Sequence, residues 1–153
     1  MGNYVDHQDL IETTLQYWSA QDVERTLELV SDNVVYQLYI SQTALPYGGE
    51  TRGKDDFRDV LFDILAQFDY LSYEPVILGI CGDVARVQTR CVLHHRASGH
   101  ELDMSKRSIF RIKHGLIVRI DEYLDAALVE SFMRLAQWRI RENAQRLTLL
   151  SGR

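Results

Sequence analysis

The sequence predicts an α+β fold, in which three helices lie in the cup of a strongly curved antiparallel or mixed sheet. The result is a cone-shaped α+β barrel with a long C-terminal helix. Apolar residues recur every three or four positions in the first half and at the end of the chain, which is typical of amphipathic helices. Between residues 71 and 124 they alternate with polar residues, which is typical of half-buried strands. The 153 residues contain no linker and no repeat, so we expect one domain over residues 1–153.

Composition limits the function. The chain is 46% hydrophobic and 25% charged, with a net charge of −5, which is ordinary for a soluble domain and argues against a nucleic-acid partner. No apolar run is long enough to span a bilayer, and the first ten residues lack the pattern of a signal peptide. Two cysteines, Cys81 and Cys91, do not make a disulfide framework. We therefore expect a cytoplasmic protein with neither membrane nor nucleic-acid partners.

Each element of the first half has a local signal. Leucine, isoleucine and tryptophan spacing predicts a helix over residues 6–20, with its first residue, Asp6, as the cap. A short helix is expected over 23–30, and the β-branched and aromatic run at 34–40 predicts a strand. Residues 41–53 contain one proline and three glycines, which predicts a long loop. An amphipathic helix is expected over 54–68.

The second half reads as strands followed by one helix. A strand over 71–80 contains Pro75 and therefore belongs at a sheet edge. A second strand covers 84–96, and a hairpin covers 102–125. The last helix extends over 126–148 beyond the barrel.

The hairpin has two possible registers. A three-residue loop at 113–115 places Lys106 opposite Glu122. A two-residue turn at 114–115 instead places Glu122 opposite Arg107.

One face of this hairpin is mostly apolar, through Phe110, Val118, Ile120 and Leu124. The same face also carries Lys106, Ser108 and Glu122. Charges on an apolar face are costly unless they are paired or border a wet cavity. This face therefore predicts a pocket.

Two side chains are candidates for catalysis. Glu122 suits a general acid/base whose pKa is raised by burial, or alternatively an ion pair with Lys106 or Arg107 that holds the hairpin in register. Tyr36 suits a hydrogen-bond donor to a ligand oxygen or a water, or alternatively a strand aromatic whose hydroxyl reaches the surface.

Two segments bear a family resemblance: SDNVVY at 31–36, after the second helix, and HGLIVRIDEYLD at 114–125. With this element order, the chain resembles the nuclear-transport-factor-two-like superfamily, and within it the SnoaL-like proteins. These include polyketide cyclases and relatives of ketosteroid isomerase and limonene epoxide hydrolase. The resemblance covers roughly residues 6–128 and implies the cone-shaped fold. It implies no single reaction, since members include isomerases, cyclases, dehydratases, epoxide hydrolases and non-enzymes.

The catalytic residues of these relatives transfer only in part. Thr14, Leu38 and Ser108 stand where ketosteroid isomerase has its tyrosine, its base and its protonated aspartate, so that mechanism is not expected. Against the epoxide hydrolases, Tyr36 and Glu122 match a water-binding tyrosine and one catalytic aspartate. The other three positions are replaced, by Leu38, Thr89 and Cys91.

These considerations predict a pocket for a small hydrophobic molecule, with Glu122 and Tyr36 as catalytic residues. The expected lining is Thr14, Trp18, Leu38, Phe57, Thr89, Cys91, Lys106, Ser108, Phe110 and Ile120. The first interpretation is an enzyme of the SnoaL-like type that isomerises, cyclises, hydrates or dehydrates a hydrophobic oxygenated compound without a cofactor or metal. The alternative is a non-catalytic ligand-binding or scaffold domain.

The outer face of the sheet predicts a partner. It mixes arginines with Val92, Ile109, Ile117 and Tyr123, and no predicted helix remains to cover it. A symmetric homodimer that buries this face is expected, and the family resemblance implies the same.

Overall fold

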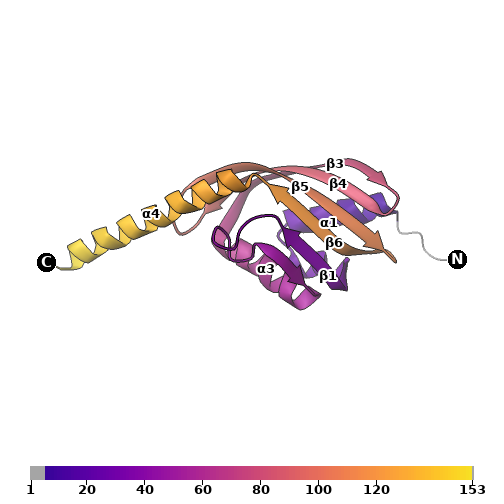
Figure 1. Cartoon of the computed structure of the whole chain (residues 1–153), viewed down its shortest axis with the longest axis horizontal. Coiled ribbons are helices and arrows are strands. Elements are labelled where there is room, and N and C mark those ends of the chain that lie inside the picture. The colour runs from indigo at the N-terminus through magenta and orange to yellow at the C-terminus, as the bar shows by residue number, and fades with distance from the viewer. Residues whose placement is uncertain (1–5, 153) are drawn as a thin grey trace.

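The computed structural model describes residues 6–152. A six-stranded sheet curves over three helices, and a fourth helix extends away from one end of the body (Figure 1). In chain order the elements are α1 (His7–Ser19), α2 (Val23–Glu28), β1 (Val30–Leu38), β2 (Gly49–Arg52), α3 (Lys54–Gln67), β3 (Phe68–Cys81), β4 (Val84–His95), β5 (Glu101–Lys113), β6 (Leu116–Leu124) and α4 (Ala126–Ser151). The predicted α+β class with a C-terminal helix is confirmed.

The strand order is β2-β1-β6-β5-β4-β3. β1 runs parallel to β6, and the other neighbours are antiparallel, so the sheet is mixed. β3 lies at an edge, as Pro75 predicts. Four register shifts interrupt the ladders: one between β1 and β6, two between β3 and β4, and one between β5 and β6. Such bulges bend a strand and strengthen its twist, which suits a sheet that closes over helices.

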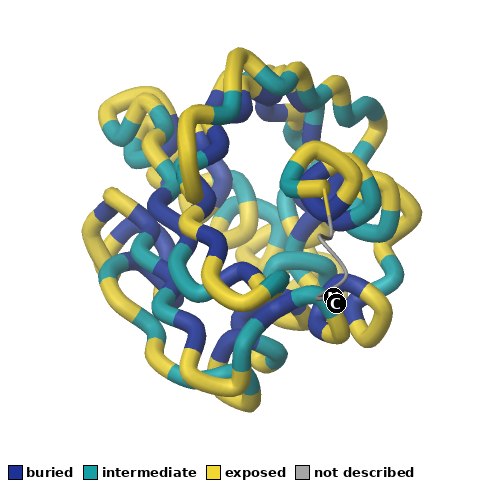
Figure 2. Tube along the Cα trace, turned by 90° about the vertical axis from the view of Figure 1, so that its right-hand side faces the viewer, coloured by how far each residue is buried: buried dark blue, intermediate teal, exposed yellow. Residues whose placement is uncertain are grey.

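The helices bury one apolar face each. On α1 the buried residues include Leu10, Ile11 and Leu15, and on α3 they include Phe57 and Leu61. Buried and more exposed positions alternate along much of the strands (Figure 2). Because successive side chains of a strand point to opposite faces, one face of the sheet forms the core. Within residues 6–152, no helix is both long and apolar enough to cross a membrane.

Several element boundaries differ from the predictions. Asp6 caps α1 as expected, because its carboxylate accepts a hydrogen bond from the Gln8 backbone N–H. The predicted loop at 41–53, however, contains β2, which pairs with the edge of β1. A four-residue strand rich in charge carries no apolar alternation, so only its hydrogen bonds to β1 reveal it. β1 itself begins at Val30, and α4 ends at Ser151.

The hairpin turn is the two-residue alternative. His114 and Gly115 both have positive φ, 52° and 74°, which is the signature of a type I′ turn. The two pairs next to the turn, Lys113–Leu116 and Ile112–Ile117, follow the predicted two-residue register. Val118 then bulges out of β6, so Arg119 pairs with Arg111 and the rest of the hairpin follows neither predicted register.

The bulge has two consequences for the buried face. Ser108 lies opposite Glu122 and Lys106 lies opposite Leu124, so the predicted register that places Lys106 directly opposite Glu122 is wrong. The predicted ion pair between these two side chains is nevertheless present, at 3.5 Å. Ile117, expected on the outer face, is fully buried, and Val118 is only half-buried. Beyond the bulge, the inward face is the predicted one, because the shorter turn and the extra residue offset each other.

Candidate functional site

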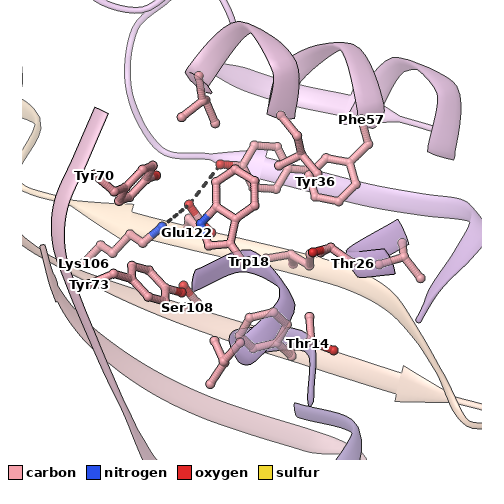
Figure 3. A pocket seen from close by; sticks show the side chains of 16 residues that line it. Thr14, Trp18, Thr26, Tyr36, Phe57, Tyr70, Tyr73, Lys106, Ser108 and Glu122 are labelled. Atoms are coloured by element: carbon pink, nitrogen blue, oxygen red, sulfur yellow. Dashed lines mark hydrogen bonds and ion pairs between the residues drawn. The ribbon is translucent and has the colours of Figure 1, made fainter. Parts of the chain in front are cut away.

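A cavity of about 50 Å³ lies between the sheet and helices α1, α2 and α3 (Figure 3). Most of its wall is aromatic or aliphatic. Its lining residues are Thr14, Leu15, Trp18, Thr26, Val30, Tyr36, Phe57, Leu61, Ile64, Tyr70, Tyr73, Lys106, Ser108, Phe110, Ile120 and Glu122.

Glu122 is the centre of the polar part of this wall. Its Oε2 atom accepts a hydrogen bond of 2.9 Å from the Tyr36 hydroxyl and lies 3.5 Å from Lys106 Nζ (Figure 3). The Lys106 side chain is 9% exposed and the Glu122 side chain 15% exposed. An ammonium and a carboxylate therefore face each other in a largely apolar enclosure, with a phenol on the same oxygen.

Three neighbouring strands bring this trio together. Glu122 lies on β6, Tyr36 on the parallel neighbour β1 and Lys106 on the antiparallel neighbour β5. Tyr36 is in register with Ile120, two residues before Glu122, so both side chains point into the cup. Lys106 pairs with Leu124, two residues after Glu122, and reaches the carboxylate diagonally.

The surroundings of the trio Tyr36, Lys106 and Glu122 shift the pKa values of Tyr36 and Lys106. Burial is the largest single effect on Lys106 and opposes its charge. The Glu122 carboxylate, followed by Tyr70, Tyr73 and Cys91, acts in the opposite direction, and together these groups outweigh burial and raise the pKa of the ammonium. Burial raises the pKa of Tyr36 well above its usual value, and the charge and hydrogen bond of Glu122 raise it further. At neutral pH, Lys106 is therefore a cation, and Tyr36 is a neutral phenol that donates a hydrogen bond to Glu122.

An aromatic wall faces Lys106 from the edge strand β3. The Tyr73 ring centroid lies 5.9 Å from Lys106 Nζ, within cation–π range. Tyr70 packs edge-on against both Tyr73 and Trp18, with centroids 5.8 Å apart in each case. Burial raises the pKa of both tyrosines, so they too stay protonated and add hydroxyl groups to the wall.

Neither tyrosine was predicted from the sequence as a site residue. Residues three apart on a regular strand point to opposite faces, so Tyr70 and Tyr73 could not both be placed inside. The register shift between Tyr70 and Ser72 leaves Leu71 unpaired and exposed, and turns both rings inward. The only sequence signal was the unusual density of aromatic residues in this strand.

A second hollow of about 40 Å³ lies beside the first. The two share Tyr36, Ile64, Tyr70, Lys106 and Glu122, so the polar trio stands between them. The remaining lining of the second hollow is Leu38, Leu45, Tyr47, Phe68, Leu93, Leu102, Met104, Leu124 and Val129. Part of the 41–48 segment and the start of α4 thus reach the site.

The structure gathers most of the predicted site residues. The main cavity contains nine of them: Thr14, Trp18, Tyr36, Phe57, Lys106, Ser108, Phe110, Ile120 and Glu122. Leu38 lines the second hollow instead.

Two predicted residues, Thr89 and Cys91, line neither hollow, although both are buried. Thr89 is paired with Lys106 and Cys91 with Tyr73, so longer neighbouring side chains extend past them into the cup. Burial raises the pKa of the Cys91 thiol, which does not favour a nucleophile. Within residues 6–152, no three His, Cys, Asp or Glu side chains are grouped to hold a metal ion.

Comparison with protein families identifies the chain. The model of the SnoaL-like domain matches residues 11–120, so the protein belongs to the SnoaL-like family. The predicted family is confirmed. No curated protein matches the chain in sequence.

Solved structures share the fold. A Bacillus subtilis protein assigned by name as an isomerase has a TM-score of 0.71 and 19% identity, over 86% of this chain and 94% of that one. An NTF2-like protein of unknown function from Burkholderia pseudomallei has a TM-score of 0.75 and 14% identity, over 89% and 98%. A protein from Silicibacter sp. assigned by name as a polyketide cyclase has a TM-score of 0.70 and 16% identity, over 84% and 93%.

Proposed function

We propose that the cavity is the active site of a cofactor-free acid/base enzyme, in which Glu122 transfers a proton on a small hydrophobic oxygenated compound. The observation that carries this proposal is the Glu122 carboxylate, held by Tyr36 at 2.9 Å and Lys106 at 3.5 Å at the wall of an apolar cavity. The two partners keep the carboxylate oriented toward the cavity, so that it is positioned to accept a proton from a bound compound.

The chemistry follows from the charges. Glu122 removes a proton from a carbon next to a carbonyl, and the electron pair of that C–H bond moves to the carbonyl oxygen. The developing oxyanion needs hydrogen-bond donors, which Lys106, Tyr73 and Ser108 supply from the same wall. Return of the proton to another carbon completes an isomerisation. Loss of a hydroxyl group as water, with the proton from Glu122, completes a dehydration.

Cavity size restricts the substrate. A volume of about 50 Å³ holds roughly three to five water molecules, at about 10–15 Å³ for each. The trio also stands between this cavity and the second hollow, so a larger ligand must displace one of the shared side chains. We therefore infer a substrate that places a short oxygenated end in the cavity, with the oxygen toward Lys106.

The test is proton exchange at carbon. A panel of small hydrophobic ketones in D₂O is incubated with the protein, and NMR follows deuterium entry next to the carbonyl. Wild type should accelerate exchange of at least one ketone, and Glu122→Gln should lower that rate by about 100-fold or more. Glu101→Gln, which removes an exposed carboxylate from β5, is the matched control and should leave the rate unchanged. Equal rates for wild type and Glu122→Gln would contradict the role of Glu122.

The alternative is a non-catalytic ligand-binding or scaffold domain. It is favoured by the proximity of Lys106 and Glu122, because a structural ion pair needs that same geometry. Binding of a ketone without any exchange would support this alternative. The homodimer through the outer sheet face and the cytoplasmic location stay predictions.

A further inference from the structure

The fourth helix is only half covered by the body. Its buried residues, Val129, Phe132, Met133 and Ala136, all lie in the first half. The second half projects from the body (Figure 1). Leucines remain exposed there, including Leu147 at 68% and Leu149 at 74%. An exposed helix with this many large apolar residues is typical of an interaction surface.

One row of residues on this helix runs unbroken from the covered half into the projecting half. Its members are separated alternately by four and three positions: Val129, Met133, Ala136, Ile140, Asn143, Leu147 and Leu150. We call this set the α4 row. This alternation is the heptad spacing that packs against a second helix. The first three members pack on the body, and Ile140, Leu147 and Leu150 stay exposed.

We propose that the projecting half of the α4 row packs antiparallel against the same segment of a second copy of this chain. A parallel pair is excluded by the body itself, because the body covers the row at residues 129–136. The first half of a parallel second helix would occupy that space. In an antiparallel pair centred near residue 145, only the projecting halves overlap, and each body lies beyond the end of the other helix.

Charge complementarity supports the antiparallel direction. Within the described residues, the last turn of α4 contains no basic side chain to stabilise the negative end of the helix dipole. With residue 145 near the two-fold axis, Arg139 and Arg141 lie beside that end of the second copy. Glu142 is within ion-pair distance of Arg139 and Arg146 in its own chain, at 3.7 and 3.3 Å, which reduces repulsion between the two basic segments.

The proposed contact between the two helices involves few residues, so the dimer should be weak. About a dozen residues of each helix meet, whereas a standard interface has roughly 20–30 residues on each side and buries roughly 800 Å² per partner. Asn143 also places one polar group in the row, which costs stability. We therefore expect a dimer that dissociates on dilution.

The first test is sedimentation velocity of the full chain over a range of concentrations. Leu147→Glu should raise the dissociation constant roughly tenfold or more, because the charge lies in the contact of both copies. Leu149→Glu is the matched control, since it puts the same charge on the opposite side of the helix. Both leucines are exposed in the single chain, so neither substitution should disturb its folding. Equal effects of the two variants, or a monomer at every concentration, would overturn the proposal.

The second test is cross-linking with a short reagent that joins two thiols. It uses a Cys81→Ser background, because Cys81 is exposed and Cys91 is buried. Ala144→Cys lies beside the row near the two-fold axis and should cross-link to its copy. Gln145→Cys, one residue later on the opposite side, should not. A dimer that cross-links at neither position, or equally at both, would assign the contact to another surface, such as the outer sheet face.

Discussion

Replacing Lys106 by methionine should strongly destabilise the fold, because the substitution leaves Glu122 without its cation. Methionine keeps most of the apolar stem but not the charge. Removing one partner of a buried ion pair costs about 3–5 kcal/mol. The Glu122 side chain keeps 15% exposure and its Tyr36 hydrogen bond, which lowers our expectation to about 2–4 kcal/mol.

A double-mutant cycle separates the pair from its parts. Glu122→Gln alone leaves the ammonium buried without its anion, whereas the double variant Lys106→Met/Glu122→Gln removes both charges. We expect the double variant to be more stable than the sum of the two single losses predicts, by about 1–3 kcal/mol. Urea unfolding at constant m-value measures each free energy of unfolding.

A second ion pair provides the control. Lys54 Nζ lies 3.4 Å from Asp32, a distance like that of the buried pair, but the Asp32 side chain is 91% exposed. Lys54→Met should therefore cost less than about 1 kcal/mol. If Lys106→Met costs no more than Lys54→Met, or if the cycle is additive, the buried pair is not the coupled unit inferred here.

Three further predictions concern single positions. Gly48→Ala should lower the melting temperature, because a Cβ there would lie 2.5 Å from the Ile40 carbonyl oxygen; an unchanged melting temperature would show that the loop shifts freely. Burial lowers the pKa of His95. Below about pH 6.5 the unfolded chain therefore binds more protons than the folded protein, and the free energy of unfolding should fall as the pH falls. His95→Gln should flatten this pH dependence, measured by urea unfolding at about pH 5 and about pH 7. Asp125→Ala should cost about 1 kcal/mol by urea unfolding, because the Asp125 carboxylate caps α4 at the Leu128 N–H; a loss near zero would mean that the end of the helix frays without it.

Local patterns in the sequence were sufficient for the class of fold. Apolar spacing defined the helices, and alternation placed Lys106, Ser108 and Glu122 on the inward face of the hairpin. These features depend only on residues that are close in the chain. The pocket was therefore predictable at the level of which strands and which face form it.

Details that depend on bulges were not predictable in the same way. One extra residue at Val118 changed every pair of the hairpin beyond the first two, and one at Leu71 turned Tyr70 and Tyr73 inward. A bulge is set by how a strand must bend to fit its neighbours, and no local pattern records it. The same applies to β2, which exists because β1 offers it an edge.

The sequence by itself determined the helices, most strands, the family and the carboxylate that faces the cup. Only the tertiary structure decided that Lys106 and Tyr36 meet that carboxylate, that Thr89 and Cys91 lie behind longer side chains, and that the cavity is small. The physical reason is distance along the chain. Tyr36 and Glu122 are 86 residues apart, and their contact depends on the parallel pairing of the first and last long strands, which no local pattern in the sequence reveals.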